Sequence, residues 1–283
     1  MEKITTIGLD IAKHVFQVHG IDVSGSVGIR KRLRRGEVLT FFAKLPPAVI
    51  GMEACATSHY WARELSALGH SVKLMPPHYV KPYVKRQKND MTDAAAICEA
   101  VTRPSMRFVP VKTEEQQAVL MLHRSRELLV RQHTMLVNAL RAHLAEFGVV
   151  MKQGKAGAAA VAALVEDAEN STLSLAVREA LLPLVEQLRH TEERIFRLEQ
   201  SIVGWHKSNP TSLRLASIPG IGPITAAAIV ATITDARLFS SGRHLAAWIG
   251  LVPRQNSSGG NPRQLSFAQQ KQMIHRSLLQ QRP

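Results

Sequence analysis

The chain has 283 residues, 45% of them hydrophobic, which is enough for two or three domains with real cores. Lys and Arg number 36 against 22 Asp and Glu, and the resulting net charge of +14 favours a polyanion such as nucleic acid as partner. Two cysteines argue against a disulfide framework and no apolar run nears the ~20 residues of a membrane span, so we expect a cytoplasmic protein with no membrane partner.

Residues 1–110 predict an α/β domain. Strands are predicted at 4–10, at 15–21, after the turn at 24–26, at 48–53 and at 71–75. Helices are predicted at 36–44 and from Thr57 to Leu68, the second one capped by Thr57 and Ser58 and closed by Gly69. Three strands followed by helix, strand, helix and strand require crossover connections, which indicates a mixed sheet.

Residues 111–207 predict a helical region of coiled-coil type. A helix start at 113–116 precedes Leu122, Leu129 and Leu136, which recur every seven residues. The Ala/Gly-rich stretch 154–163 interrupts this apolar face, and a second heptad-like pattern runs from Leu181 to Trp205. We therefore expect a hairpin of two long helices that separates two domains and pairs with another subunit.

A small helical domain is predicted at 208–260, followed by an atypical tail at 261–283. Gly220 and Gly222 form a Gly-x-Gly hairpin ahead of the apolar segment 224–233. Backbone N–H groups in such a hairpin can hold a phosphate, although an ordinary helix–helix turn is the alternative. The tail is polar and rich in Gln, so we expect an irregular helix or poor order there.

Four acidic residues are the strongest candidates for chemistry. Asp10 and Glu53 each end an apolar strand pattern, and Asp90 and Asp93 share one face at the start of a predicted helix. Four carboxylates at one point repel each other unless a cation holds them, and oxygen ligands indicate Mg²⁺ and a phosphate-bearing substrate. The alternatives are a turn role for Asp10 and helix-dipole roles for Asp90 and Asp93.

Basic residues surround these acids in two clusters, with Tyr79 and Tyr83 beside the second. The clusters comprise Arg30, Lys31, Arg32, Arg34 and Arg35 in the first, and Lys81, Lys85, Arg86 and Lys88 in the second. Aromatic rings among cations suit single-stranded or structured RNA, because the rings stack on bases while the cations bind phosphates; a solvated surface is the alternative.

A loop in the third region carries candidate nucleophiles. Ser257 and Ser258 follow Arg254, which we expect to contact nucleic acid. A serine that attacks a phosphodiester forms a covalent link and conserves the bond energy, whereas the spacing alone is more typical of a linker.

Several motifs together resemble the DEDD transposases of insertion sequences, the group related to Piv-type DNA invertases. In the first region these are Ile7–Lys13 (IGLDIAK), Gly51–Cys55 (GMEAC) and Lys88–Ala94 (KNDMTDA). In the third region they are Leu215–Gly222 and Leu245–Arg254. The resemblance covers about residues 4–260.

This resemblance implies a RuvC-like, RNase H-like N-terminal domain, a coiled-coil insertion and a C-terminal transposase domain. It implies that Asp10, Glu53, Asp90 and Asp93 bind Mg²⁺ and that Ser258, or else Ser257, attacks DNA to form a phosphoserine intermediate. It also implies a structured guide RNA, double-stranded DNA at the element ends and target, and a homo-oligomer, either dimer or tetramer, with composite active sites.

The stretch after 260 departs from the family's basic, Gly-containing continuation. We therefore expect a truncated or frameshifted copy. The alternatives to a serine-using recombinase are a RuvC-like nuclease, in which the serine is incidental, and an inactive nucleic-acid-binding remnant. A nucleotide-binding α/β protein would need a Gly-rich phosphate loop after the first strand, and Asp10–Lys13 supplies none.

Overall fold

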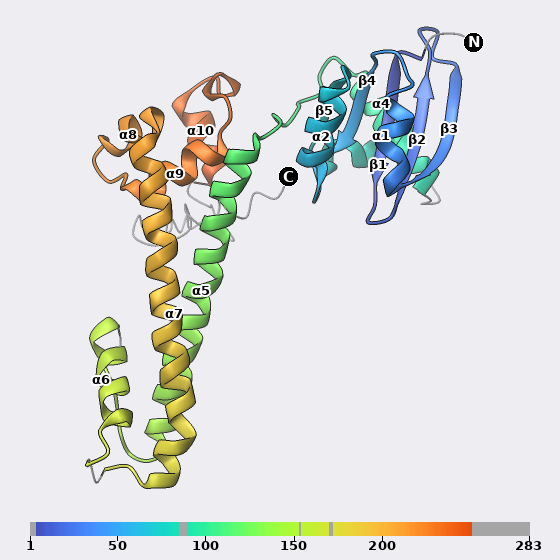
Figure 1. The fold of residues 1–283 in the computed structure, drawn as a ribbon. Coiled ribbons are helices and arrows are strands. Elements are labelled where there is room, and N and C mark those ends of the chain that lie inside the picture. Colours follow the sequence, from blue (N-terminus) through green and yellow to red (C-terminus); the bar gives the residue numbers. More distant parts are fainter. Residues whose placement is uncertain (1–3, 85–89, 153, 170–171, 251–283) are drawn as a thin grey trace, which may run out of the picture. The chain divides into compact units, whose positions relative to one another are not determined.

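The structure, a computed structural model, describes residues 4–84, 90–152, 154–169 and 172–250, without the side chains of Asp90 and Lys155 (Figure 1). Its contacts divide the chain into two units, each treated by itself below. One unit contains Met1–Glu115 with Ile233–Pro283, and the other is Gln116–Thr232. No helix among the described residues is long and apolar enough to cross a membrane.

The first unit is built on a five-stranded mixed sheet of order β3-β2-β1-β4-β5. The strands are β1 (Thr6–Ile11), β2 (Val15–Ile21), β3 (Val27–Arg34), β4 (Val49–Glu53) and β5 (Ser71–Met75). Strands β1, β2 and β3 pair antiparallel, while β4 is parallel to both β1 and β5. The expected mixed sheet is confirmed, and β2 and β5 have the predicted bounds.

Helices cover both faces of this sheet. On one face, α1 (Val38–Phe42) and α2 (Ser58–Ala67) bury Phe42 and Trp61 against strand residues such as Ile7, Leu9 and Met52. On the other, α4 (Asp90–Val101) packs against β1, β2 and β4. The unit also contains the 3-10 helices η1 (Arg35–Glu37), η2 (Lys81–Tyr83) and η3 (Ala236–Leu238) and the α-helices α3 (Pro77–Val80) and α10 (Gly242–Ile249).

Two helix predictions need correction at their ends. The helix expected at 36–44 is a 3-10 turn followed by the five-residue α1. Thr57 does precede α2, but it has a left-handed backbone with φ of 75° and its side chain makes no capping hydrogen bond. Gly69, with φ of 92°, ends this helix as expected, because glycine adopts the left-handed backbone conformation without steric strain.

The second unit contains a long helical hairpin. Helices α5 (Glu114–Ala145) and α7 (Leu175–Ser208) run antiparallel along each other (Figure 1). Polar contacts join them at two levels: Arg126 Nε donates to Glu199 Oε1 at 2.8 Å in a salt bridge, and His133 Nε2 lies 2.9 Å from Glu192 Oε1. The predicted coiled-coil hairpin is therefore confirmed as two antiparallel long helices.

The Ala/Gly-rich stretch, expected to interrupt the hairpin, instead forms helix α6 (Lys155–Glu166). Its Val161 and Val165 are fully buried with Leu181 and Leu188 of α7. Alanine has the highest helix propensity, and the small side chains allow α6 to pack closely, so this stretch adds a helix where the sequence suggested a break.

A helix–turn–helix follows the hairpin. Asn209 caps α8 (Pro210–Ala216) by accepting a hydrogen bond from Ser212 N–H at 2.9 Å. The turn contains Gly220 with φ of 89°, and α9 (Pro223–Thr232) then buries alanines against α7 and α8. The helices predicted on either side of the Gly-x-Gly hairpin are therefore present.

Candidate functional site

Asp10 and Glu53 project from the same face of the sheet at the ends of two neighbouring parallel strands. Leu9 pairs with Met52 in the β1–β4 ladder, and Asp10 and Glu53 each come one residue later. Gly8 and Gly51 face α4, because a β-carbon on either would collide with Ala94 or Val101 of that helix. Since side chains alternate along a strand, Asp10 and Glu53 also face the α4 side.

Gly8 and Gly51 have no side chains, and this allows α4 to lie close to the sheet. A β-carbon on Gly8 would stand 2.4 Å from Cys98 N, and one on Gly51 would stand 2.8 Å from Val101 Cβ. Neither distance is sterically allowed, so any larger residue would push α4 away. The glycines thus bring the helix that carries Asp93 close to the strands that carry Asp10 and Glu53.

The pKa of the Cys55 thiol depends on both carboxylates. Partial burial raises its pKa, and the negative charges of Glu53 and Asp10 raise the pKa further. Both charges are therefore close enough to act on one neighbouring group. Asp10, Glu53 and Asp93 are each half-buried, which allows contact with a ligand from solvent.

The second pair of acids begins α4. Asp93 directly precedes Ala94, the residue that lies over Gly8. Asp90 is the first residue of α4, but its side chain is outside the described part of the chain. Among the described side chains, no three His, Cys, Asp or Glu residues form a metal-binding group. The donor set of carboxylate oxygens on one sheet face nevertheless suits a hard divalent cation.

The first basic cluster lies on the edge strand β3 and, for Arg35, at the start of η1. Alternation along β3 divides its residues between the two faces of the sheet. Lys31 Nζ stands 5.0 Å from the centre of the Phe41 ring, and the Arg35 guanidinium stands 5.0 Å from the Trp61 ring. These two cations lie on the face covered by α1 and α2. By the same alternation Arg30, Arg32 and Arg34 lie on the α4 face with the carboxylates.

Other predicted contact residues are only partly described. Lys81 is exposed in η2, next to Tyr83, whose ring lies 5.6 Å from the Arg103 guanidinium. Gly220 and Gly222 lie in the α8–α9 turn, where a phosphate contact stays a prediction. Lys85, Arg86, Lys88, Arg254, Ser257 and Ser258 lie outside the described residues.

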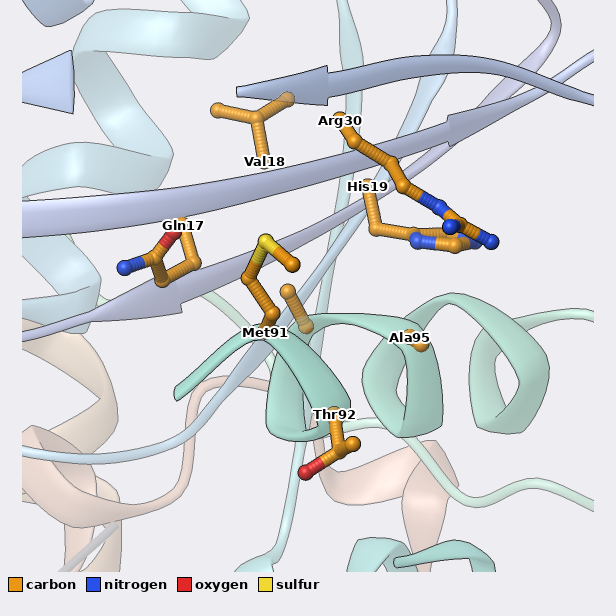
Figure 2. Close-up of a pocket in the computed structure, with 8 residues that line it drawn as sticks. Gln17, Val18, His19, Arg30, Met91, Thr92 and Ala95 are labelled. Carbon is orange, nitrogen blue, oxygen red and sulfur yellow. The ribbon is translucent and has the colours of Figure 1, made fainter. Parts of the chain in front are cut away.

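Sequence reasoning missed a cleft between β2, β3 and α4. Gln17, His19, Arg30 and Met91 line a cavity of about 190 Å³ on the same sheet face as Asp10 (Figure 2). The signal was present in VFQVHGI, where Gln17 and His19 interrupt an apolar strand. Alternating polar residues in a strand covered on both faces indicate a polar site under the covering helix.

Two family models match the chain. One, described as "Transposase IS116/IS110/IS902 family", matches residues 212–281, and a DEDD transposase model of the IS110 group, described as "Transposase", matches residues 7–149. The first match includes residues 261–281, which the sequence analysis set apart from the family pattern. The second match contains all four candidate acids.

Individual relatives match most of the chain. A probable family 20 transposase of Pseudomonas aeruginosa is 48% identical over 98% of this chain and 82% of its own length. The transposase for insertion sequence element IS1328 of Yersinia enterocolitica is 39% identical over 99% of this chain and 83% of its own. The pilin gene-inverting protein of Moraxella lacunata is 25% identical over 72% of this chain and 56% of its own. The chain therefore belongs to the IS110/IS116 family of transposases, enzymes that cleave and recombine DNA.

Proposed function

We propose that this transposase is a Mg²⁺-dependent DNA recombinase that forms a covalent serine–DNA intermediate. The observation that carries the proposal is the placement of Asp10 and Glu53 at the carboxyl ends of two neighbouring parallel strands, facing the helix that carries Asp93. Ligands of open α/β sheets bind at this edge. Asp10, Glu53, Asp90 and Asp93 would hold the divalent cation.

The bound cation would neutralise charge on the phosphodiester and lower the barrier to its substitution. The four carboxylates would hold this cation, and without it their negative charges would repel the DNA backbone. Ser258, or Ser257 beside it, would supply the nucleophile: its Oγ forms a bond to phosphorus as the P–O bond to the leaving deoxyribose oxygen breaks. The serine proton passes to solvent or a base, and the leaving oxygen takes up a proton. Attack by another DNA end on the phosphoserine reverses these steps and restores a phosphodiester.

Partner choice is the second part of the proposal. We propose that double-stranded DNA at the element ends and target binds through Arg30, Arg32 and Arg34 on the α4 face of β3 and through Lys81 of η2, and that a structured RNA guides the choice of site. The net charge of +14 supports binding to polyanions, and the resemblance to guided recombinases supports the RNA.

The long hairpin supports a homo-oligomer. Met121, Leu128 and Met135 follow each other at seven-residue steps on α5, and their side chains are 63%, 50% and 70% exposed. An exposed apolar stripe with heptad spacing is what a second coiled-coil helix would cover. We propose a dimer or tetramer in which the serine of one subunit meets the carboxylates of another.

Covalent capture tests the chemistry. The full chain would be incubated with Mg²⁺, the RNA transcribed from the gene's flanks and labelled plasmid carrying those flanks, then denatured and resolved by electrophoresis. We expect DNA attached to protein, lost in Ser258→Ala and Asp10→Asn and after chelation, and kept in Glu193→Gln, an exposed control on α7. Cleavage without attached DNA, unaffected by Ser258→Ala and Ser257→Ala, would instead indicate a nuclease that activates water.

A further inference from the structure

We propose that the cleft between β2, β3 and the start of α4 binds one unstacked nucleotide of the DNA strand that enters the carboxylate site. Arg30 and Arg32 would hold its backbone phosphates, Met91 and His19 would contact the base, and Gln17 would bond to the base edge. This inference rests on the proposed function, because it names the strand on which the carboxylates act.

The sheet register places the cleft beside the carboxylates. Asp10 pairs with Gln17 and Gln17 pairs with Arg32, so these three side chains form one row on the α4 face. Glu53 of β4 extends the row beyond Asp10. Neighbouring strands are about 4.8 Å apart, so Arg32 lies about 10 Å from Asp10, two strands away. A nucleotide at Arg32 would therefore place an adjacent phosphate within reach of the acids.

Gln17 is the observation that points to a ligand. Its side chain is 7% exposed, and its Oε1 has no hydrogen-bond partner among the described residues. An unsatisfied buried acceptor is costly, so a protein that retains one gains something else from it. A nucleobase supplies the missing donor through an exocyclic amine or ring N–H.

The rest of the cleft suits a base and its phosphate. Met91 extends from α4 toward β2 between Gln17 and His19, while Arg30 lies against His19 (Figure 2). Met91 is 54% exposed, so its side chain is accessible to a ligand that enters the cleft. Burial and the Arg30 charge lower the pKa of His19, which favours the neutral ring, and a neutral ring can stack on a base. The cavity of about 190 Å³ is too small for a duplex.

Arginines of β3 continue the path away from the cleft. Arg30, Arg32 and Arg34 are exposed on one face and alternate residues of a strand are about 7 Å apart. Lys31 and Arg35, over Phe41 and Trp61, lie on the opposite face. The cations of β3 and η1 are thus divided between the two faces of the sheet, and only the α4 face leads to Asp10.

This division provides a charge-matched experiment. The probe is fluorescein-labelled single-stranded DNA of mixed sequence, bound to the full chain without Mg²⁺ and followed by anisotropy over a salt series. We expect Arg30→Ala with Arg32→Ala to weaken binding roughly tenfold at about 0.1 M salt, and to lower the salt slope by about 1.4, two single-strand phosphate contacts at ~0.7 each. Lys31→Ala with Arg35→Ala removes the same charge and should cost less than about threefold.

Gln17→Met tests the base contact with little change of volume. We expect thermal stability to be kept or raised, because a buried unpaired acceptor is removed. Preference among homopolymeric strands of the four bases should flatten to within about twofold. A base preference equal to that of the wild type would show that Gln17 does not contact the base.

Equal losses from the two double variants would overturn the cleft assignment, since charge alone would explain both. Tighter binding of an RNA strand of the same sequence, with the same residue dependence, would assign the cleft to RNA and also overturn it. These binding measurements require no catalysis, so they can fail while covalent capture succeeds. Conversely, loss of covalent capture with intact cleft binding would refute only the proposed chemistry.

Discussion

Gly8 lies directly beneath Ala94, so closely that a β-carbon on Gly8 would stand 2.1 Å from the Ala94 carbonyl oxygen. This contact joins β1, which ends in Asp10, to the helix that begins with Asp90 and Asp93. The position of the α4 acids relative to the strand acids therefore depends on a residue that carries no functional group.

Gly8→Ala should destabilise the first unit by about 1–3 kcal/mol, because the methyl group overlaps backbone atoms that cannot move singly. Recombination activity should also fall in the variant that still folds, because a shift of α4 moves Asp93 away from Asp10 and Glu53. Gly36→Ala is the control: no described atom lies within 4 Å of its β-carbon position, and its φ is not positive. Denaturant unfolding of both variants measures the difference, and equal stabilities would show that α4 tolerates displacement.

Asp10→Asn should raise thermal stability in the absence of divalent cations, because it removes repulsion between the Asp10 and Glu53 carboxylates. Addition of Mg²⁺ should raise the melting temperature of the wild type and have little effect on the variant, since a ligand stabilises the state that binds it. Differential scanning fluorimetry with and without Mg²⁺ measures both. A variant that Mg²⁺ stabilises as much as the wild type would exclude Asp10 as a ligand.

Arg30→Gln should raise the pKa of His19, because one of the two causes that lower it is removed while burial remains. The lowered folded-state pKa means that the unfolded chain binds the proton first as pH falls. This histidine therefore reduces stability progressively below its unfolded pKa of about 6.5. NMR titration of the imidazole resonances measures the shift. An unchanged pKa would indicate that the Arg30 charge is screened from the ring.

Leu128→Glu should weaken self-association, because it places a charge in the exposed apolar stripe of α5. Thr134→Glu adds the same charge at an exposed position of that helix about 120° away from Leu128, and it should leave association unchanged. Light scattering after size exclusion gives the mass of each. Identical masses for Leu128→Glu and the wild type would refute this face as the subunit interface.

Much of the fold follows from local patterns. β2 and β5 could be bounded from sequence because an apolar run with turn residues at both ends permits few alternatives. Helix α6 could not, since glycines and alanines are compatible with both a break and a helix, and burial of Val161 and Val165 against α7 decides between them.

The candidate site divides in the same way. The amino-acid sequence alone determined which carboxylates end strands or begin a helix, because those positions follow from local hydrophobic patterns. Only the tertiary structure decided that β1 and β4 are parallel neighbours, that Lys31 and Arg35 lie apart from Arg30 and Arg32, and that Gln17 is buried beside Asp10. Strand pairing and register join residues far apart in the chain, and a shift of one residue would reverse the face of every side chain.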